Sequence, residues 1–370
     1  INKMWFNQVH AILGASLVTH DQSLRSFASD NYAGVHPEVL TAIASANDGH
    51  QSAYGYDDYT KALQQKMRDE FGQQAETFVV FNGTGANVLA LTAMMPRWGA
   101  VICSNLAHIE TDEGGAPERV SGLKLFNVQH VNGKLTPESI ATQVYDIDFE
   151  HRAQPLVVSI TQSTEVGTVY SVAEIKAIAD YCHENKLLLH LDGARIWNAA
   201  ASLGVTFKEM ITDTGVDVVS FGGTKNGVIA AEAVVVINPE AVDGLIFLRK
   251  LSMQLMSKMR FASAQLLALM EDGLGMRSAA HANKMASYLR HLLEAKVEKG
   301  EIVGLRFTNP TDANAVFACL PAEAIAKIRE QVHFYDWDLK TNEVRWMCAF
   351  DTTEADVERF VGIISEALKP

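Results

Sequence analysis

An acidic residue and a lysine each follow an apolar run of the chain. Residues 187–191 lead into Asp192, and residues 216–221 lead into a glycine loop that carries Lys225. A lysine amine can form a Schiff base, and a carboxylate can hold the proton of a pyridinium nitrogen; pyridoxal 5'-phosphate (PLP) requires both. The pair therefore indicates this cofactor. Two alternatives stay open at this point: Asp192 caps the following helix, and Lys225 is a solvated surface lysine.

Both apolar runs are typical of buried strands that end in loops. The intervening residues 195–203 and 206–214 are long enough for a helical crossover, so we expect the two strands to be parallel. Parallel strands present their carboxyl ends at one edge of a sheet, where open α/β proteins bind ligands. We predict that Asp192 and Lys225 come from neighbouring strands and face one site.

A glycine turn lies between a predicted strand at 77–81 and a predicted helix that continues to residue 95. Free backbone N–H groups and the positive end of the helix dipole suit such a turn to a phosphate, and the Thr84 hydroxyl adds a donor. The turn is neither a dinucleotide fingerprint nor a P-loop, so an ordinary strand-to-helix turn stays open. Because the turn precedes the acid and the lysine, it is a candidate phosphate site.

Three further segments carry polar residues that suit a ligand site. His108 follows a predicted strand at 101–104 and could stack on a flat ring; alternatively, it is a surface histidine and the acids of its loop are solvated. Ser29 belongs to a polar cluster that either reaches a ligand or forms a turn. Arg345 lies on the opposite face of the predicted strand 343–350 from its apolar residues, and is either solvated or turned toward the first domain.

The composition is that of a soluble globular protein: 48% of the 370 residues are hydrophobic, 20% are charged, and the net charge is −13. This acidic balance argues against nucleic acid or an anionic membrane as a partner. The four cysteines are scattered without a zinc-ligand spacing, which favours reduced thiols in a cytoplasmic protein and predicts no metal. The apolar residues 11–18 are too few to span a bilayer, and we expect no signal peptide.

The alternation of strands and helices stops after a predicted strand at 234–237. Long helices are expected at 239–270 and 278–297, followed by short strands and a last helix that Thr353 caps. By its length the chain should form two domains. The expected divisions are an N-terminal segment, 1–50, that packs on the small domain; a large PLP-binding α/β domain, 51–250; and a small C-terminal α+β domain, 251–370.

In their order and spacing, these segments resemble the fold type I PLP enzymes, and among them the L-threonine aldolase family with its phenylserine aldolase branch. The resemblance extends from about residue 26 to the C-terminus. It implies an α/β fold with a mostly parallel central sheet flanked by helices and a smaller C-terminal α+β domain. The matching motifs are Ser29-Asp30-Asn31, Tyr54-Gly55, Gly83-Thr84-Gly85-Ala86-Asn87, Ala107-His108 with Glu113-Gly114-Gly115, Asp192-Gly193-Ala194-Arg195, Thr224-Lys225 and Met259-Arg260.

The resemblance implies a role for each matching residue. Lys225 would hold PLP covalently, Asp192 would keep its ring nitrogen protonated, and His108 would stack on the ring. The substrate carboxylate would be bound by Ser29, Arg195 and Arg345, and a neighbouring subunit would complete the site with Tyr54 and Arg260. The implied cofactor contacts further include Gly83, Thr84, Arg195, Thr224, Arg260 and, as an additional candidate, Lys250.

The implied reaction is the retro-aldol cleavage of L-threonine-like or phenylserine-like β-hydroxy-α-amino acids to glycine and an aldehyde. One departure matters: where many family members have an asparagine and, two residues later, a histidine, this chain has Ser163 and Glu165. The hydrogen bond to a cofactor oxygen and the identity of the base therefore stay open. We expect His108 to be the base, directly or through water, and Glu165 to orient it.

Other functions also stay open. A PLP-dependent aminotransferase or β-eliminating lyase would share Asp192 and Lys225, and a relative without catalytic activity would keep the architecture. A nicotinamide enzyme lacks support because no dinucleotide fingerprint is present. We expect a small amino-acid substrate, and a homodimer or homotetramer with shared active sites.

Overall fold

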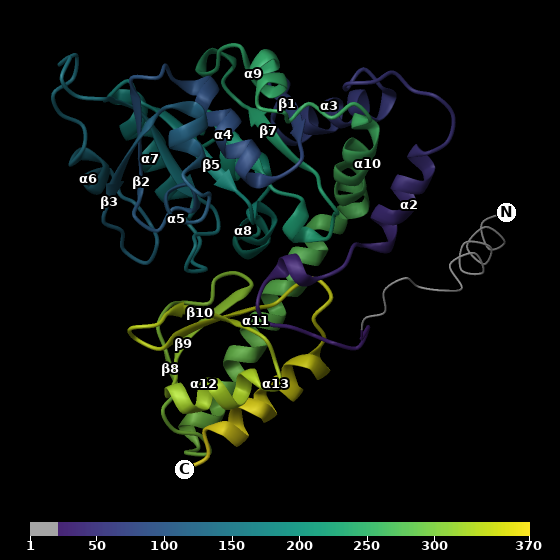
Figure 1. Ribbon diagram of the computed structural model, residues 1–370, viewed down its shortest axis with the longest axis vertical. Coiled ribbons are helices and arrows are strands. Elements are labelled where there is room, and N and C mark those ends of the chain that lie inside the picture. Colours follow the sequence, from purple (N-terminus) through teal and green to yellow (C-terminus); the bar gives the residue numbers. More distant parts are fainter. Residues whose placement is uncertain (1–20) are drawn as a thin grey trace.

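The computed structural model describes residues 21–370, which form two β-sheets with flanking helices (Figure 1). The larger sheet has seven strands, and six of them run parallel to one another while β7 is antiparallel to both of its neighbours. In spatial order its strands are β1 (Glu76–Val80), β7 (Glu232–Val236), β6 (Val218–Phe221), β5 (Leu188–Gly193), β4 (Gln154–Thr161), β2 (Gly99–Ser104) and β3 (Lys124–Val128).

The strands that precede Asp192 and Lys225 are neighbours in this sheet. β5 and β6 pair in parallel, with Asp192 opposite Ser220. The connection between them consists of α8 (Ile196–Leu203) and a π-helical turn at Lys208–Thr212. The predicted parallel pair is confirmed, and the carboxyl ends of both strands lie at one edge of the sheet.

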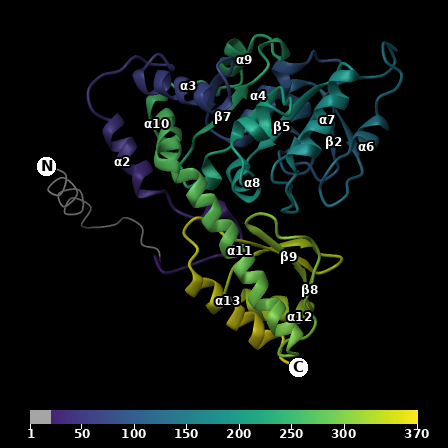
Figure 2. The same ribbon diagram turned by 180° about the vertical axis from the view of Figure 1, so that it is seen from behind.

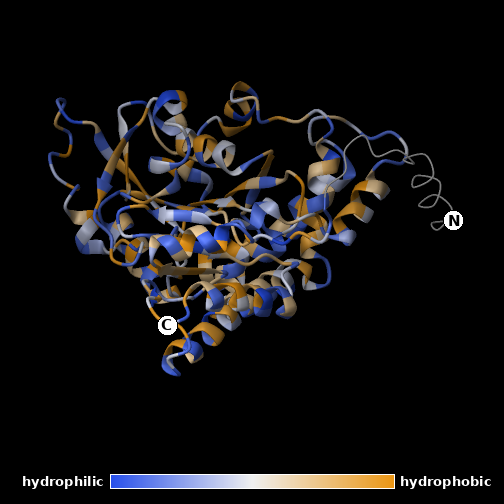
Figure 3. Ribbon diagram, turned by 60° about the horizontal axis from the view of Figure 1, so that its bottom comes forward, coloured by the Kyte–Doolittle hydropathy of each residue, from blue (hydrophilic) through white to orange (hydrophobic). Residues whose placement is uncertain are grey.

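Helices cover both faces of the large sheet, because successive strand residues point to opposite sides. Val79 belongs to a core on one face and Val80 to a core on the other. In Figure 3 many helices carry an apolar side, in orange, and a polar side, in blue. The first core includes residues of α2 (Pro37–Ala46), α3 (Asp58–Phe71), α7 (Val172–Glu184), α8 and α10 (Met259–Met270), and the second includes residues of α4 (Gly83–Met94) and α9 (Leu245–Leu251).

Local signals define where several of these helices begin and end. The Asp57 side chain accepts the N–H of Thr60 at the start of α3, and Gly72, with a φ of 111°, follows the last residue of that helix. Ser171 and Glu174 form a capping box at the start of α7. Shorter elements are the 3-10 turns Asp30–Tyr32, Thr224–Asn226, Pro239–Ala241 and Glu271–Gly273, the π-helical turn Pro117–Ser121, and the helices α5 (His108–Thr111) and α6 (Pro137–Ala141).

The C-terminal part contains the smaller sheet, which is antiparallel. One face of it packs in a separate core that includes Val344 and Trp346. The last helix begins with a capping box at Thr353, as predicted. In spatial order the strands are β10 (Tyr335–Asp338), β11 (Glu343–Met347), β9 (Ala315–Cys319) and β8 (Arg306–Phe307), and the helices are α11 (Leu274–Glu298), α12 (Ala322–Arg329) and α13 (Glu354–Ala367).

The long helix α11 joins the two parts of the molecule (Figure 2). Its first turns contribute Leu274 and Ala279 to the core of the large sheet, and its later turns contribute Met285 and Leu289 to the core of the small sheet. Phe27 also packs in the small-sheet core, where its ring stacks on Phe360 at 4.2 Å between centroids. Two distant segments of the chain therefore fix the small sheet below the large one.

Some predicted elements have different bounds. The helix expected over 239–270 is interrupted, because Met253 has a φ of 60° and residues 252–258 separate α9 from α10. α11 begins four residues before the expected position 278, and β11 ends at Met347 rather than at residue 350. The strands β3 and β10 were not anticipated.

The domain division at residues 50 and 250 stays a prediction. Residues 26–29 contact the small sheet, since the Phe27 carbonyl oxygen accepts the N–H of Met347 in β11 and the Phe27 N–H donates to the carbonyl oxygen of His333, just before β10. In contrast, α2 packs against α10 beside the large sheet. The predictions for residues 1–20, including the apolar segment 11–18, lie outside the described residues. Among residues 21–370, no helix is long and apolar enough to cross a membrane.

Candidate functional site

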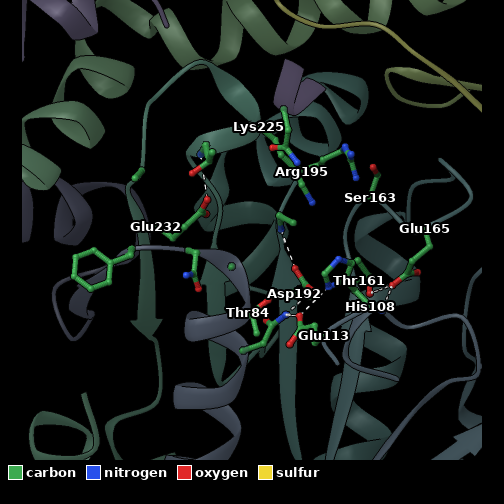
Figure 4. A pocket seen from close by; sticks show the side chains of 18 of the residues that line it. Thr84, His108, Glu113, Thr161, Ser163, Glu165, Asp192, Arg195, Lys225 and Glu232 are labelled. Carbon is green, nitrogen blue, oxygen red and sulfur yellow. Dashed lines mark hydrogen bonds and ion pairs between the residues drawn. The ribbon is translucent and has the colours of Figure 1, made fainter. Parts of the chain in front are cut away.

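A cavity of about 560 Å³ lies at the carboxyl edge of the large sheet (Figure 4). Its wall is formed by the turn that leads into α4, the start of α5, the end of β4 with the loop after it, the end of β5, the loop after β6 and the start of β7. The predicted site residues that line it are Gly83, Thr84, His108, Glu165, Asp192, Arg195, Thr224 and Lys225. Ser29, Tyr54, Arg260 and Arg345 are not among its lining residues.

Lys225 lies on the 3-10 turn that follows β6 and faces this cavity (Figure 4). Burial, followed by the positive charge of Arg195, lowers the pKa of the Lys225 amine below its ordinary value. A lowered pKa increases the fraction of unprotonated amine, which is the nucleophilic form. The alternative of a solvated surface lysine is therefore wrong.

Asp192 is the second-to-last residue of β5, and both of its carboxylate oxygens are hydrogen-bonded. Oδ1 accepts the N–H of Ala194 at 3.0 Å, and Oδ2 accepts the side-chain amide of Asn87 at 2.9 Å. The following helix, α8, has Arg195 at its N-cap position, so Asp192 does not cap that helix. The carboxylate is instead a fixed group in the wall of the cavity.

The turn before α4 offers backbone donors to an anion. The first N–H groups of a helix have no acceptor within the helix. The Asn82 side chain accepts the N–H of Gly85 at 2.7 Å, which leaves the N–H groups of Gly83 and Thr84 for another acceptor. A Cβ built on Gly83 would meet nothing within 4 Å, so space exists in front of the turn. These features fit a phosphate group.

Glu232, at the start of β7, is a cavity residue that the sequence analysis missed. Its carboxylate accepts the N–H of Gly223 at 2.9 Å and that of Thr224 at 3.2 Å. It therefore fixes the loop that carries Lys225. Burial raises the pKa of Glu232. The available signal was a single acid within an otherwise apolar run, 231–236.

His108 is held at the cavity by its own loop. Its Nδ1 lies 2.8 Å from Oε1 of Glu113, and the same oxygen accepts the Asn87 amide at 2.8 Å. The hydrogen bond to Glu113 raises the pKa of His108, against the effect of burial. Glu110 and Asp112 are exposed, but Glu113 is buried, so the interpretation of this loop as a solvated acidic face is wrong for Glu113.

Glu165 lies beside His108 in the loop after β4 (Figure 4). Its Oε1 accepts the hydroxyl of Thr161 at 2.7 Å and the backbone N–H of His108 at 3.0 Å. Its Oε2 is buried and has no hydrogen-bond partner among residues 21–370. Burial raises the pKa of Glu165 to about 7. This carboxyl group can therefore gain or lose a proton near neutral pH.

Arg195 is largely engaged by another side chain of this protein. Its Nε and Nη2 donate to the two carboxylate oxygens of Asp30 at 2.7 and 2.9 Å. Burial, the largest single influence, would raise the pKa of Asp30. The charge and hydrogen bonds of Arg195, the charge of Lys225 and the hydrogen bond from Asn314 together outweigh it and lower that pKa. A bidentate contact of Arg195 with a substrate carboxylate would have to replace this ion pair.

Arg345 points away from the core of the small sheet, toward the N-terminal segment. Its Nη2 donates to the carbonyl oxygen of Ala28 at 3.2 Å, while its buried Nε has no partner among residues 21–370. Burial, followed by the charge of Arg195, lowers the pKa of Arg345 to about 10. Ser29 is close in sequence to this contact, and its Oγ accepts the N–H of Asn31.

Tyr54, Lys250 and Arg260 lie outside the cavity of their own chain. The Lys250 amine lies 5.2 Å from the centroid of the Tyr54 ring, and Arg260 Nη1 donates to the carbonyl oxygen of Gly49 at 3.2 Å.

Solved structures share this fold over nearly the whole chain. The threonine aldolase of Leishmania major has a TM-score of 0.86 and 30% sequence identity, over 93% of this chain and 99% of that chain. The serine palmitoyltransferase of Sphingomonas wittichii has a TM-score of 0.69 at 14% identity, over 98% of this chain and 96% of that chain, and supports the fold alone. The architecture is that of the fold type I PLP enzymes, as predicted.

Sequence comparisons define the relationship more narrowly. The family model of the beta-eliminating lyases matches residues 26–333. The low specificity L-threonine aldolase of a Pseudomonas species is 43% identical over 345 residues, which are 93% of this chain and 98% of that protein. The chain belongs to the beta-eliminating lyase family and, within it, to the L-threonine aldolase group. The family predicted from the motifs is confirmed.

Proposed function

We propose that this protein uses PLP to cleave L-threonine-like or phenylserine-like β-hydroxy-α-amino acids to glycine and an aldehyde. The observation that carries this proposal is the position of Lys225 and Asp192, which come from neighbouring strands and face one cavity. The reaction and the cofactor predicted from the sequence are those of the family to which the chain belongs.

The residues of the cavity fit PLP. The N–H groups of Gly83 and Thr84, which lie at the positive end of α4 and have no acceptor within that helix, would hold its phosphate. Thr224 also lines the cavity, and Lys225 provides the amine for covalent attachment. Asp192 would keep the ring nitrogen protonated, and His108 would lie against the ring. When bound, PLP supplies the electron sink that stabilises a carbanion next to the substrate amine.

Cleavage requires a base that removes the proton of the β-hydroxyl group. We propose that His108 accepts this proton, directly or through a water molecule, and that Glu165 orients His108 through its backbone N–H. The pKa of Glu165, about 7, makes Glu165 the second candidate for the base. Ser163, which replaces the asparagine of many family members, lines the cavity with a shorter side chain.

Substrate binding is proposed to involve Arg345 together with Arg195 and Ser29. Arg345 does not line the cavity of the free protein, but it lies close enough to the cavity residue Arg195 for the charge of Arg195 to lower its pKa. Its buried, unpaired Nε offers a donor for a carboxylate. Arg195 uses two nitrogens for Asp30 and would contribute through the others, while Ser29 would add a hydroxyl. Binding of an anion would also compensate the burial of the guanidinium group.

The active unit is proposed to be a homodimer or homotetramer. Tyr54, Lys250 and Arg260 lie outside the cavity of their own chain, where they could complete that of a second copy. The adjacent helix α9 exposes Phe247 and Leu251, which suits a contact between subunits.

A cytoplasmic location is also proposed, because each of the four cysteines is free.

A β-eliminating lyase or an aminotransferase is the alternative, and the name of the matching family model favours the first. Incubation of the purified protein with L-threonine and with phenylserine separates these functions. We expect glycine and an aldehyde in equal amounts, and near-visible absorption that changes when glycine is added. Release of ammonia would favour elimination, a keto acid would favour transamination, and an unchanged spectrum would favour a relative without catalytic activity.

A further inference from the structure

A chain of hydrogen bonds connects His108 to Asp192 across the floor of the cavity (Figure 4). Glu113 Oε1 contacts His108 Nδ1 at 2.8 Å and Asn87 Nδ2 at 2.8 Å, and Asn87 Nδ2 also donates to Asp192 at 2.9 Å. The residues that His108 reaches through these hydrogen bonds come from three elements: Asn87 from α4, Glu113 from the loop after α5, and Asp192 from β5. The imidazole is thereby fixed relative to both the proposed phosphate site and the proposed ring-nitrogen site.

Glu113 is suited to control the position of one proton on the His108 ring. The Glu113 side chain is completely buried, and its Oε1 lies 2.8 Å from Nδ1. An ionised carboxylate only accepts hydrogen bonds, so a neutral imidazole paired with it carries its proton on Nδ1. Nε2 then has a free lone pair, and it has no hydrogen-bond partner among residues 21–370. Glu165 cannot perform this task, because it contacts the backbone N–H of His108 and not the ring.

We propose that Glu113 is a positioning residue that holds the His108 imidazole with Nδ1 protonated and Nε2 directed to the substrate as the proton acceptor. This inference rests on the proposed function, since it concerns the base of the cleavage step. During that step the O–H bond of the substrate breaks and Nε2 gains the proton. The oxygen electron pair forms the C=O bond of the aldehyde as the Cα–Cβ bond breaks, and the electron pair left on Cα would be taken up by bound PLP. The imidazolium that forms is paired with the Glu113 carboxylate.

Several charged groups around His108 change its pKa, so the effect of Glu113 must be separated from theirs. Glu113 and Asp192 favour the protonated imidazole, and Lys225, together with burial, opposes it. Glu165 contacts the backbone of His108 from the loop after β4. Glu113→Gln keeps the shape and an acceptor oxygen for Nδ1 but removes the charge. Asp112→Asn removes the charge of the adjacent exposed residue and is the matched control.

The first experiment is an NMR titration of the holoenzyme with isotopically labelled histidine, in which His108→Asn identifies the His108 signal. In the unmodified enzyme, nitrogen shifts above the titration should show a proton on Nδ1 of His108. Glu113→Gln should lower the pKa of His108, and Asp112→Asn should leave it unchanged. A neutral ring with its proton on Nε2, or an equal pKa in both variants, would overturn the proposal. If Glu113→Gln fails to fold, the tautomer of His108 in the unmodified enzyme still tests the proposal.

The second experiment is the pH profile of kcat/KM. Glu113→Gln should move the acidic limb to lower pH and lower the plateau by about ten- to a hundredfold, less than the loss of His108 itself. A purely structural role would lower the rate without moving the limb, and this result would also overturn the proposal. If His108→Asn keeps full turnover while the NMR results are as expected, the base assignment fails but the pairing of Glu113 with His108 stands.

Discussion

The two sides of the cavity hold their acidic groups differently. On the side of β5 and β6, Asp192 uses both carboxylate oxygens, which accept from Ala194 and Asn87. On the side of β4 and α5, Glu165 has both of its contacts on Oε1, and its buried Oε2 has no partner among residues 21–370. The first arrangement suits a group that fixes a cation in place, and the second suits a group that exchanges protons near neutral pH.

The largest effect is expected on the β5 and β6 side. Lys225→Ala should abolish turnover and the near-visible absorption of bound PLP, because no second amine lines the cavity in residues 21–370. The measurements are an absorbance spectrum and an aldehyde assay, with the exposed Lys258→Ala as control. Full aldolase activity in Lys225→Ala would remove this residue from the site.

The next largest effect tests the β4 and α5 side. His108→Asn should lower the cleavage rate by about two to four powers of ten, because the variant lacks the proposed base. The spectrum should still show bound cofactor, because Lys225 and Asp192, which are proposed to hold PLP, are unchanged. The exposed His50→Asn serves as control. A variant that loses cofactor affinity but cleaves normally at saturating PLP would reduce His108 to a stacking platform.

The β5 and β6 side was also the more predictable from the sequence. Apolar runs define where β5 and β6 end, and parallel pairing then brings Asp192 and Lys225 to one edge whatever the details of packing. The other side depends on loop conformation. Nothing in the spacing of 108 and 113 distinguished buried Glu113 from exposed Asp112, and Glu232 was hidden in an apolar run.

Contacts between distant segments were the least predictable. The ion pair between Asp30 and Arg195 joins residues 165 positions apart, and it changes what Arg195 can offer a substrate. The break between α9 and α10 depends on a left-handed residue, Met253, for which helical periodicity gives no signal. The alternation along β11, in contrast, correctly placed Arg345 opposite Val344.

A smaller effect is expected from the proposed carboxylate contact, which belongs to neither side. Arg345→Ala should mainly raise KM for the amino acid, because the residue binds substrate and does not move a proton. Loss of a charge-assisted contact to a desolvated partner costs about 2 to 5 kcal/mol, a factor of tens to thousands. The exposed Arg359→Ala is the control. Normal saturation kinetics of Arg345→Ala would contradict the contact.

The smallest effect on catalysis is expected for Glu165→Gln, with a rate loss of less than about tenfold if His108 is the base. Stability provides the sharper test. The folded protein holds a proton on Glu165 up to a pH of about 7, whereas the unfolded chain loses it near its ordinary pKa of 4.5. The free energy of unfolding must therefore fall as the pH rises between these values.

Glu165→Gln removes this pH dependence, so the variant should gain thermal stability relative to the parent at pH 8 and gain little at pH 4.5. The gain is measured as Tm after removal of PLP, with the exposed Glu323→Gln as control. An equal change in Tm at both pH values would mean that Glu165 titrates normally. A Glu165→Gln variant without activity, beside an active His108→Asn, would place the base on the loop after β4 and reverse the roles of the two residues.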